Sequence, residues 1–286
     1  MPKSISISQI EGKPGQVYYP LSLDEVPKPT PTGSELLIKV SAAALNHRDL
    51  FIRQHLYPGT AFGIPLLADG SGIVESTGPS ADSSWKGKKV VINPGTGWKD
   101  SMDGPEDPQG YKILGGTKTL PNGTLQEYMV VEQSEVEEAP VHLSMVENAA
   151  IPLTGLTAWR AVMVKCGEHN LKPGKNILIT GIGGGVALMA LTFATAAGAS
   201  VWVTSGDQAK IDKAVKLGAK GGVIYKEDGW EKKLLGMLPS SSKQIDAIVD
   251  GAGGNSIEKG ARLLKVSRAS KMALCFTNVS DRLVAS

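Results

Sequence analysis

The chain has 286 residues, 41% of them hydrophobic, so it can bury a sizeable core, and its length suggests two domains while leaving one large domain open. Thirty Lys and Arg against 28 Asp and Glu leave a formal net charge of +2 with no dominant run of one sign, which argues against nucleic-acid binding. Two distant cysteines, Cys166 and Cys275, argue against a disulfide framework or a thiolate zinc site and favour a reducing, cytoplasmic setting.

The N-terminus lacks the apolar run of a signal peptide. The uncharged stretch 176–206 has the length of a membrane span, but five glycines interrupt it, so we expect a buried α/β unit there and no membrane association.

Residues 1 to about 145 contain short alternating or β-branched runs separated by Gly and Pro, at 36–40, 72–76, 89–92 and 127–131. Such spacing is typical of a small β-barrel or sandwich. The stretch 93–123 is so rich in Gly, Pro, Asp and Asn that it predicts a long surface loop.

Ser144 and Glu147 have the form of a capping box, and apolar residues then recur at helical spacing to Val164, with an expected interruption at Pro152. Strands and helices alternate from residue 172 onwards. Strands are expected at 176–180, 200–204, 222–225 and 245–249, with helices ending near 197 and spanning 207–217 and 230–237. This alternation predicts a doubly wound parallel sheet.

A glycine turn lies between the first of these strands and its helix: Gly181, Gly184 and Ala187 stand at i, i+3 and i+6, and Gly185 and Val186 begin the helix. Without Cβ atoms the backbone can turn sharply and approach a pyrophosphate at the helix N-terminus. A tight turn without a ligand is the alternative, but the surrounding strand, helix and strand favour dinucleotide binding.

The end of the second strand selects the cofactor, because an acidic residue there binds a ribose 2′-OH and repels a 2′-phosphate. It reads Thr204-Ser205-Gly206, and the following Asp207 is better placed to cap a helix. Ser205 and Lys210 offer a donor and a cation, which favours NADP(H) over NAD(H), although a solvated surface position for Lys210 stays open.

Four segments, 46–59, 65–79, 123–162 and 177–210, together resemble the medium-chain dehydrogenase/reductase superfamily, especially its zinc-free quinone-oxidoreductase and zinc-type alcohol dehydrogenase-like branch. The resemblance implies an α/β protein with a GroES-like, β-rich substrate and catalytic domain at 1–145, a Rossmann NADP(H)-binding domain at 146–286, and an active site in the cleft between them.

In zinc-containing members a Cys stands at the position of Asn46 and a His-Glu pair at Ala68-Asp69, and structural-zinc members carry four cysteines in the loop that corresponds to 93–123. This chain has none of these ligands, so the resemblance implies no metal site.

By the same resemblance, Asn46 and Tyr57 face the nicotinamide and can hydrogen-bond a substrate carbonyl, Asp49 is a candidate active-site carboxylate, and Thr157 contacts the nicotinamide end. Each has an ordinary alternative: Tyr57 anchors a turn, and Asp49 starts a helix. For Asp69 we favour a hydrogen bond to backbone in a turn.

Arg48 and Arg53 are expected to be solvated or ion-paired, and one of them is a candidate phosphate ligand.

These features predict an NADPH-dependent oxidoreductase that transfers hydride to a quinone, an enone or a related activated carbonyl compound without zinc. Two alternatives stay open: a cofactor-binding, catalytically weak relative, and a truncated product with little activity. The resemblance ends near Lys265, before the segment that supplies further strands and the homodimer surface in relatives, so we expect a C-terminally incomplete Rossmann domain. The stretch 271–277 is a candidate for a fifth strand.

Overall fold

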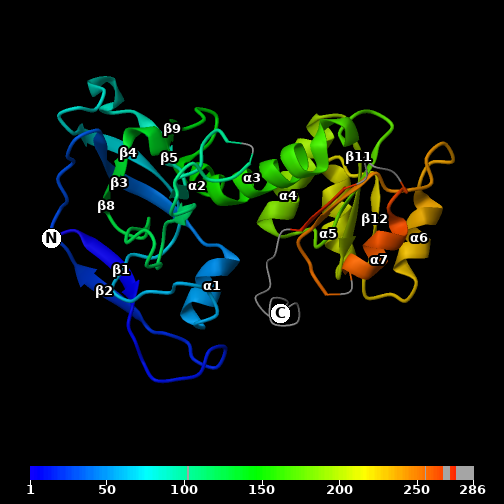
Figure 1. The fold of residues 1–286 in the computed structure, drawn as a ribbon, viewed down its shortest axis with the longest axis horizontal. Helices are drawn as coiled ribbons and strands as arrows, with labels where there is room; N and C mark the ends of the chain where they lie inside the picture. Colours follow the sequence, from blue (N-terminus) through cyan, green and yellow to red (C-terminus); the bar gives the residue numbers. More distant parts are fainter. Residues whose placement is uncertain (102, 255, 267–270, 275–286) are drawn as a thin grey trace. The chain divides into compact units, whose positions relative to one another are not determined.

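The computed structural model describes residues 1–101, 103–254, 256–266 and 271–274 (Figure 1). The chain divides into two compact units, Met1–Leu153 and Thr154–Ser286. The division falls after residue 153 instead of the predicted 145, because helix α2 (Met145–Ala149) belongs to the first unit. The Ser71 hydroxyl in that unit's sheet donates a 2.6 Å hydrogen bond to the Met145 carbonyl.

The first unit is built on a five-stranded antiparallel sheet with the order β8-β3-β4-β5-β9. Its strands are β3 (Glu35–Ala44), β4 (Asp69–Thr77), β5 (Lys89–Ile92), β8 (Tyr128–Glu132) and β9 (Val136–Glu138). The first four overlap the predicted strands and confirm them. Apolar side chains that alternate along these strands meet in a buried cluster that includes Leu36, Ile38, Val90 and Met129.

Shorter elements complete this unit. They are β1 (Lys3–Ile7), β2 (Leu21–Glu25), α1 (His47–Arg53), η1 (Ser83–Trp85), β6 (Gly95–Thr96), β7 (Lys112–Ile113) and η2 (Gln133–Glu135). β1 pairs with β2, and β6 pairs with β7 inside the segment that was predicted as a loop. The described part of that segment is otherwise irregular, as predicted.

The second unit contains a parallel five-stranded sheet with the order β12-β11-β10-β13-β14. The strands are β10 (Asn176–Ile179), β11 (Ser200–Ser205), β12 (Gly221–Ile224), β13 (Ala247–Asp250) and β14 (Lys271–Leu274). The helical elements are α3 (Pro152–Trp159), whose first two residues still belong to the first unit, η3 (Arg160–Gly167), η4 (Glu168–Asn170), α4 (Gly185–Ala196), α5 (Gln208–Lys216), α6 (Trp230–Met237) and α7 (Ser256–Leu263).

Helices cover both faces of this sheet (Figure 1). Ile177 and Ile179 of β10 pack in one buried cluster with residues of α4 and α5, whereas Leu178 between them packs in another with residues of α6 and α7. The sheet is therefore doubly wound, and its strand order places β10 and β13 where the winding direction reverses.

The capping box and the interruption at Pro152 are both confirmed. The Ser144 hydroxyl accepts the Glu147 amide at 3.3 Å, and the Glu147 carboxylate accepts the Ser144 amide at 2.8 Å. Pro152 then starts α3, where its missing N–H costs no helical hydrogen bond.

A fifth strand was expected at 271–277. β14 supplies it over Lys271–Leu274, and 275–277 lie outside the described residues, as do any further strands after them. In the part of the chain that the structure describes, no helix has the length and apolarity to cross a membrane.

Candidate active site

The glycine turn joins β10 to α4 through a backbone conformation that residues with a side chain rarely adopt. Gly181 and Gly183 have φ angles of 66° and 115°, in the left-handed region that favours glycine. Gly184 is the N-cap of α4, and Gly185 is its first residue. The three consecutive glycines 183–185 are exposed, so the free amides of the first helical turn are open to an anion.

Neighbouring strand ends hold this turn in place. The Gly181 amide donates to the Thr204 hydroxyl at 3.3 Å, and the Ile182 amide donates to the Thr204 carbonyl at 2.9 Å. The Thr180 hydroxyl donates to the Asp250 carboxylate at the end of β13 and accepts the Gly251 amide at 3.1 Å. The turn therefore lies at the carboxyl ends of β10, β11 and β13, where doubly wound folds bind their ligands.

Helix α3 packs closely on the start of α4. A Cβ at Gly185 would lie 2.8 Å from Thr154 Cγ2, so glycine is needed for this approach. Thr157 follows Thr154 by three residues on the same helix, which puts both on one face. Thr157 was predicted as a cofactor contact. Val186, another predicted cofactor contact, is half-buried in the first turn of α4. Thr154 was not among the predicted site residues.

Two cations lie near the predicted adenosine end. A Cβ at Gly183 would lie 3.6 Å from Lys210 Nζ, and a Cβ at Gly206 would lie 3.3 Å from Lys226 Nζ and 3.1 Å from the Tyr225 hydroxyl. Asp207 caps α5 as predicted, because its carboxylate accepts the Ala209 amide at 2.9 Å.

Ser205 is buried, and its hydroxyl accepts the Asp207 amide at 3.1 Å. Tyr225 and Lys226 were missed. They follow β12, which pairs with β11 in parallel and in the register Ser205↔Ile224, so the residues after both strands come together. That register is the signal that could have found them.

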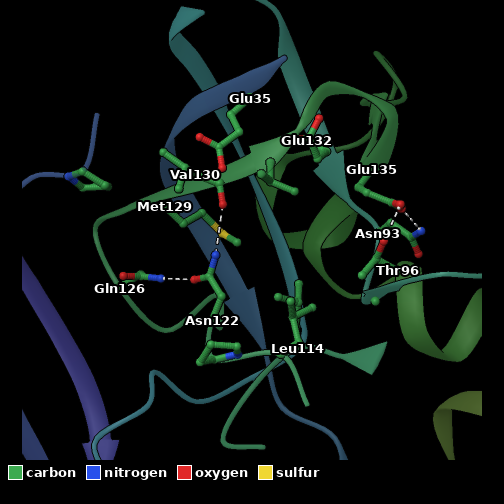
Figure 2. A pocket seen from close by; sticks show the side chains of 15 residues that line it. Glu35, Asn93, Thr96, Leu114, Asn122, Gln126, Met129, Val130, Glu132 and Glu135 are labelled. Carbon is green, nitrogen blue, oxygen red and sulfur yellow. Dashed lines mark hydrogen bonds between the residues drawn. The ribbon is translucent and has the colours of Figure 1, made fainter. Parts of the chain in front are cut away.

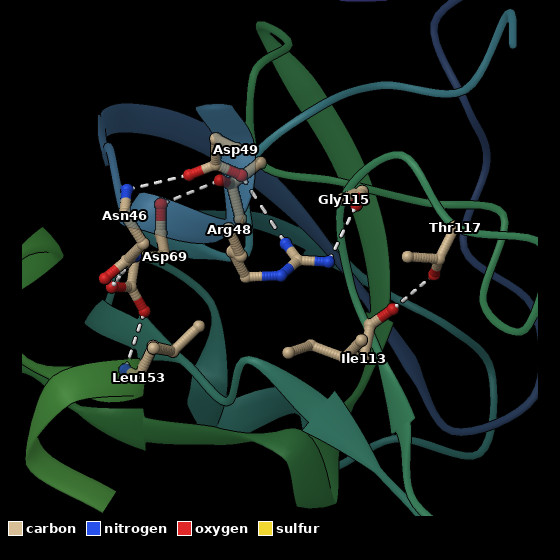
Figure 3. A network of polar contacts seen from close by, with 9 residues as sticks. Asn46, Arg48, Asp49, Asp69, Ile113, Gly115, Thr117 and Leu153 are labelled. Carbon is tan, nitrogen blue, oxygen red and sulfur yellow. Dashed lines mark hydrogen bonds and ion pairs between the residues drawn. The ribbon is translucent and has the colours of Figure 1, made fainter. Parts of the chain in front are cut away.

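The first unit holds a buried polar network that ties α1 to β4 (Figure 3). The Asn46 side-chain amide donates to the Asp69 carboxylate at 2.8 Å, and the Asn46 backbone amide donates to the Asp49 carboxylate at 2.7 Å. The Leu153 amide donates to the second Asp69 oxygen at 2.7 Å. Asp49 therefore has the helix-start role, and Asp69 binds both backbone and side chain from the first residue of a strand instead of from a turn.

Burial raises the pKa of both carboxyl groups, Asp49 and Asp69. Burial has the largest effect on Asp69, and its pKa is raised to about 6. The hydrogen bonds with Asn46 and Leu153 lower the pKa, but by less than burial raises it. Burial also raises the pKa of Asp49, against the opposing effects of its hydrogen bond with the Asn46 backbone and of the Arg48 charge.

Arg48 is buried and ion-paired with Asp49, which is one of the two settings expected for it. Its guanidinium donates to the Gly115 carbonyl at 3.0 Å, lies 3.5 Å from the Asp49 carboxylate, and stands 4.7 Å from the centre of the Tyr57 ring. The Tyr57 carbonyl accepts the Thr60 hydroxyl at 2.8 Å, so Tyr57 also has the turn role that was its alternative. Arg53 is half-buried and donates to the Tyr19 carbonyl at 2.9 Å.

Tyr111, from the predicted surface loop, belongs to the same region and was missed. Its hydroxyl would lie 2.6 Å from a Cβ at Gly95. Burial raises the pKa of Tyr111 to about 12, and the charges of Glu135, Asp69 and Arg48 also act on it. A phenol is protonated at neutral pH even at its ordinary pKa of 10.0, so the hydroxyl of Tyr111, a residue that is 38% exposed, can donate a hydrogen bond.

The donor set at the predicted metal positions does not fit a tetrahedral zinc. Ala68 carries no ligand atom, and the Asn46 amide and the Asp69 carboxylate are hydrogen-bonded to each other. Among the described residues, no group of three or more His, Cys, Asp and Glu side chains could hold a metal ion.

Comparison with known proteins agrees with this architecture. The family described as "Alcohol dehydrogenase GroES-like domain" matches residues 32–141. The zinc-type alcohol dehydrogenase-like protein YogA of Leptosphaeria maculans is 47% identical over 271 residues, which are 93% of this chain and 75% of that protein. Crotonyl-CoA carboxylase/reductase of Cereibacter sphaeroides is 29% identical over 80% of this chain and 53% of its own length.

The crystal structure of an NAD-dependent alcohol dehydrogenase superposes with a TM-score of 0.80 at 31% identity, over 95% of this chain and 76% of that one. The chain thus spans three quarters of the YogA relative and about half of the crotonyl-CoA relative. With its GroES-like unit, its doubly wound sheet and its glycine turn, the chain belongs to the medium-chain dehydrogenase/reductase superfamily of oxidoreductases.

Proposed function

We propose that this protein is an NADP(H)-dependent oxidoreductase that transfers hydride to a quinone, an enone or a related activated carbonyl compound without zinc. The observation that carries the proposal is the end of β11, where Gly206 stands beside the Tyr225 hydroxyl and the Lys226 ammonium group. The nearest carboxylate along the chain, Asp207, is engaged in capping α5. A 2′-phosphate is favoured there over a bare ribose hydroxyl.

The proposed cofactor site uses the glycine turn for the pyrophosphate. The free amides at the start of α4, from Gly185 and Val186, would hold its charge, and Gly181 and Gly184 would let the backbone approach it. Lys210, next to Gly183, would neutralise a phosphate, while the Ser205 hydroxyl and Lys226 would bind the adenosine end. Thr157 would contact the nicotinamide, which supplies the hydride when bound.

The proposed catalytic residues come from the network in the first unit. When hydride adds to an enone or a quinone, negative charge develops on the carbonyl oxygen, so donors aimed at that oxygen accelerate the reaction. Tyr57 and the Asn46 amide would be these donors. Asp69 fixes the Asn46 side chain, and Asp49 fixes its backbone, so we assign positioning roles to both carboxylates.

Independence from zinc is proposed on the chemistry of the side chains. An activated acceptor needs no Lewis acid, and the residues at the metal positions are an amide, a methyl group and a hydrogen-bonded carboxylate. The crotonyl-CoA carboxylase/reductase relative is named as a reductase, which favours reduction of a conjugated acceptor as the reaction class.

The test is a screen of the purified protein for NADPH oxidation, followed at 340 nm, with a panel of quinones and conjugated enones and with a saturated ketone. Reduction of NADP⁺ by an alcohol is measured beside it. We expect turnover with at least one conjugated acceptor and none with the saturated ketone. Fluorescence titration with NADPH is run on the same sample. Binding of NADPH without oxidation by any acceptor would favour the alternative of a catalytically weak cofactor-binding protein.

A further inference from the structure

Asp69 holds two elements at once through its two carboxylate oxygens (Figure 3). One oxygen, Oδ2, accepts the side-chain amide of Asn46, the N-cap of α1, at 2.8 Å. The other, Oδ1, accepts the backbone amide of Leu153, the second residue of α3, at 2.7 Å. The side chain that fixes a proposed substrate donor is therefore also the acceptor for the first turn of a helix.

Helix α3 belongs to both units of the chain, because the division falls between Leu153 and Thr154. Leu153, near its start, packs against the buried cluster of the first unit. Ala158, near its end, is part of a buried cluster of the second unit. The backbone of one helix thus links a residue held in the first core to a residue held in the second.

The residue that follows Leu153 reaches the glycine turn. Thr154 Cγ2 lies 2.8 Å from the position of a Cβ at Gly185, the first residue of α4. The amides at this end of α4 are the ones that are open to an anion. An anion that orders the first turn of α4 therefore acts on a turn that α3 contacts.

The backbone of Asp69 is held in place by the sheet. Asp69 is the first residue of β4, pairs with Ala44 of β3, and its carbonyl accepts the Thr124 hydroxyl at 2.7 Å. Its carboxylate can therefore adjust only by rotation about the bonds of its own side chain. A rotation that keeps Oδ1 on the Leu153 amide also moves Oδ2, and with it the Asn46 amide.

Stability alone does not account for a carboxylate at this position. Burial raises the pKa of Asp69, so the ionised form that predominates at neutral pH lowers the free energy of unfolding relative to the protonated acid. Arg48 and Asp49 act on this charge in opposite directions. An asparagine would avoid the charge, but it has only one oxygen, and its nitrogen cannot accept a hydrogen bond from Asn46.

We propose that Asp69 couples the cofactor site to the substrate site: when the glycine turn binds the cofactor pyrophosphate, α3 is held more firmly, and Asp69 passes this order from Leu153 to Asn46. The inference rests on the proposed function, which assigns the turn to the cofactor and Asn46 to the substrate oxygen. Such a coupling is reciprocal, so a ligand bound at Asn46 also favours binding at the turn.

The probe is 2′-phospho-ADP-ribose, which carries the pyrophosphate and the adenosine end but no nicotinamide, so hydride transfer takes no part. Hydrogen exchange, followed by mass spectrometry at neutral pH, is measured for the peptide that contains residues 46–49, with and without saturating probe. We expect the probe to slow this exchange by on the order of fivefold, the lower end of typical coupling between sites. ADP-ribose is measured in parallel, so the result does not depend on which nicotinamide cofactor the protein prefers.

Two variants break the path at different places. Asp69→Asn keeps an acceptor for the Leu153 amide and faces Asn46 with a nitrogen, so the probe should still bind while the slowing at residues 46–49 disappears. Thr154→Ala removes the contact with α4 and leaves the hydrogen bond between Asp69 and Asn46 intact. It should have the same effect, and it tests the coupling even if Asp69→Asn does not fold.

The control is Glu132→Gln, in the pocket that Figure 2 shows. Glu132 lies on β8 of the same sheet as Asp69, and its carboxylate accepts the Ser34 hydroxyl at 2.7 Å. The described residues that line this pocket do not include Asn46, Asp69, Leu153 or Thr154. This variant loses a hydrogen-bonded carboxylate outside the path, so it should keep the wild-type slowing.

Two results would overturn the proposal: exchange at residues 46–49 of the wild type that saturating probe leaves unchanged, or slowing that persists in a folded Asp69→Asn or Thr154→Ala variant. If neither probe binds at all, the cofactor site is contradicted and the coupling with it. Failure of the acceptor screen alone would contradict the proposed reaction and leave the exchange result standing, because neither probe carries a nicotinamide.

Discussion

Asp69 is buried and accepts two hydrogen bonds, and its ionisation should change the free energy of unfolding. The folded-state pKa of about 6 lies above the usual 3.8, so the native protein holds this proton more tightly than the unfolded chain does. The protonated Asp69 therefore contributes to the free energy of unfolding. This contribution is fully present below about pH 4 and is lost as the pH rises through about 6, and it totals on the order of 3 kcal/mol.

Urea unfolding of wild type and Asp69→Asn between about pH 4 and 7 checks this. The wild-type free energy of unfolding should decline more steeply with pH than that of the variant, whatever their absolute difference. Asp228→Asn, at an exposed carboxylate, is the control and should keep the wild-type slope. Equal slopes in wild type and Asp69→Asn would show that Asp69 does not carry the effect.

Tyr57 is proposed to donate a hydrogen bond to the substrate oxygen. Tyr57→Phe keeps the ring that lies against Arg48 and removes only the hydroxyl, so kcat should fall about tenfold or more while the Kd for NADPH stays unchanged. Tyr18→Phe, which removes the hydroxyl of a half-exposed tyrosine, is the matched control. Unchanged kcat in Tyr57→Phe would leave Tyr57 with its turn role alone.

Lys226 is proposed to bind the 2′-phosphate from the loop after β12. Lys226→Ala should raise the Kd for NADPH about tenfold and leave the Kd for NADH unchanged, because only NADPH carries the phosphate. Lys213→Ala, which removes an exposed lysine on α5, controls for overall charge. An equal loss for both cofactors, or tighter binding of NADH by wild type, would contradict the assignment.

At the scale of the elements, the contact between α3 and α4 depends on a missing side chain. Gly185→Ala places a methyl group 2.8 Å from Thr154 Cγ2, and such overpacking costs about 1 to 3 kcal/mol, more than the gain in helix propensity. We expect a lower Tm and about tenfold weaker NADPH binding.

Thr154→Ser removes the opposing methyl group and keeps the hydroxyl, so it should restore both quantities in the double variant. Scanning calorimetry and fluorescence titration of the single and double variants measure this. If the double variant is no better than Gly185→Ala alone, the contact between the two helices is not what requires glycine.

Local periodicity predicted most of the regular elements. The β-branched runs at 89–92 and 200–204 became β5 and β11, and the capping box and Pro152 fixed where α2 and α3 begin. These features depend on residues that are close together in the chain, so they can be recognised from the sequence alone. The pairing of β1 with β2 was missed, because their register, Lys3↔Glu25 to Ile7↔Leu21, joins segments separated by a long connection.

The site was only partly predictable for the same reason. Arg48 was expected to be solvated or ion-paired, but its burial depends on the Gly115 carbonyl, 67 positions away in the chain, which the residue type alone does not show. The Asn46 and Asp69 side chains were named as replacements for metal ligands, but their mutual hydrogen bond depends on how α1 meets β4. Tyr111 lay in a segment whose composition indicated only a loop.

At the scale of the whole molecule, the two units contribute different chemistry to the proposed reaction. The second unit supplies the glycine turn and the cations at the ends of β11 and β12, and the first supplies Asn46, Tyr57 and the buried carboxylates. The proposed reaction requires only these groups for hydride transfer from NADPH to an activated acceptor, without zinc.

The most direct measurement is a single turnover with NADPH carrying deuterium at the transferable C4 position, using protein treated with a chelator and checked for zinc by elemental analysis. The substrate is the acceptor identified in the screen, and mass spectrometry follows the product. We expect a product with one deuterium bound to carbon, or for a quinone one oxidised NADPH per hydroquinone, at the rate of untreated protein. Product that forms only after zinc is restored, or oxidation of NADH but not NADPH, would contradict it.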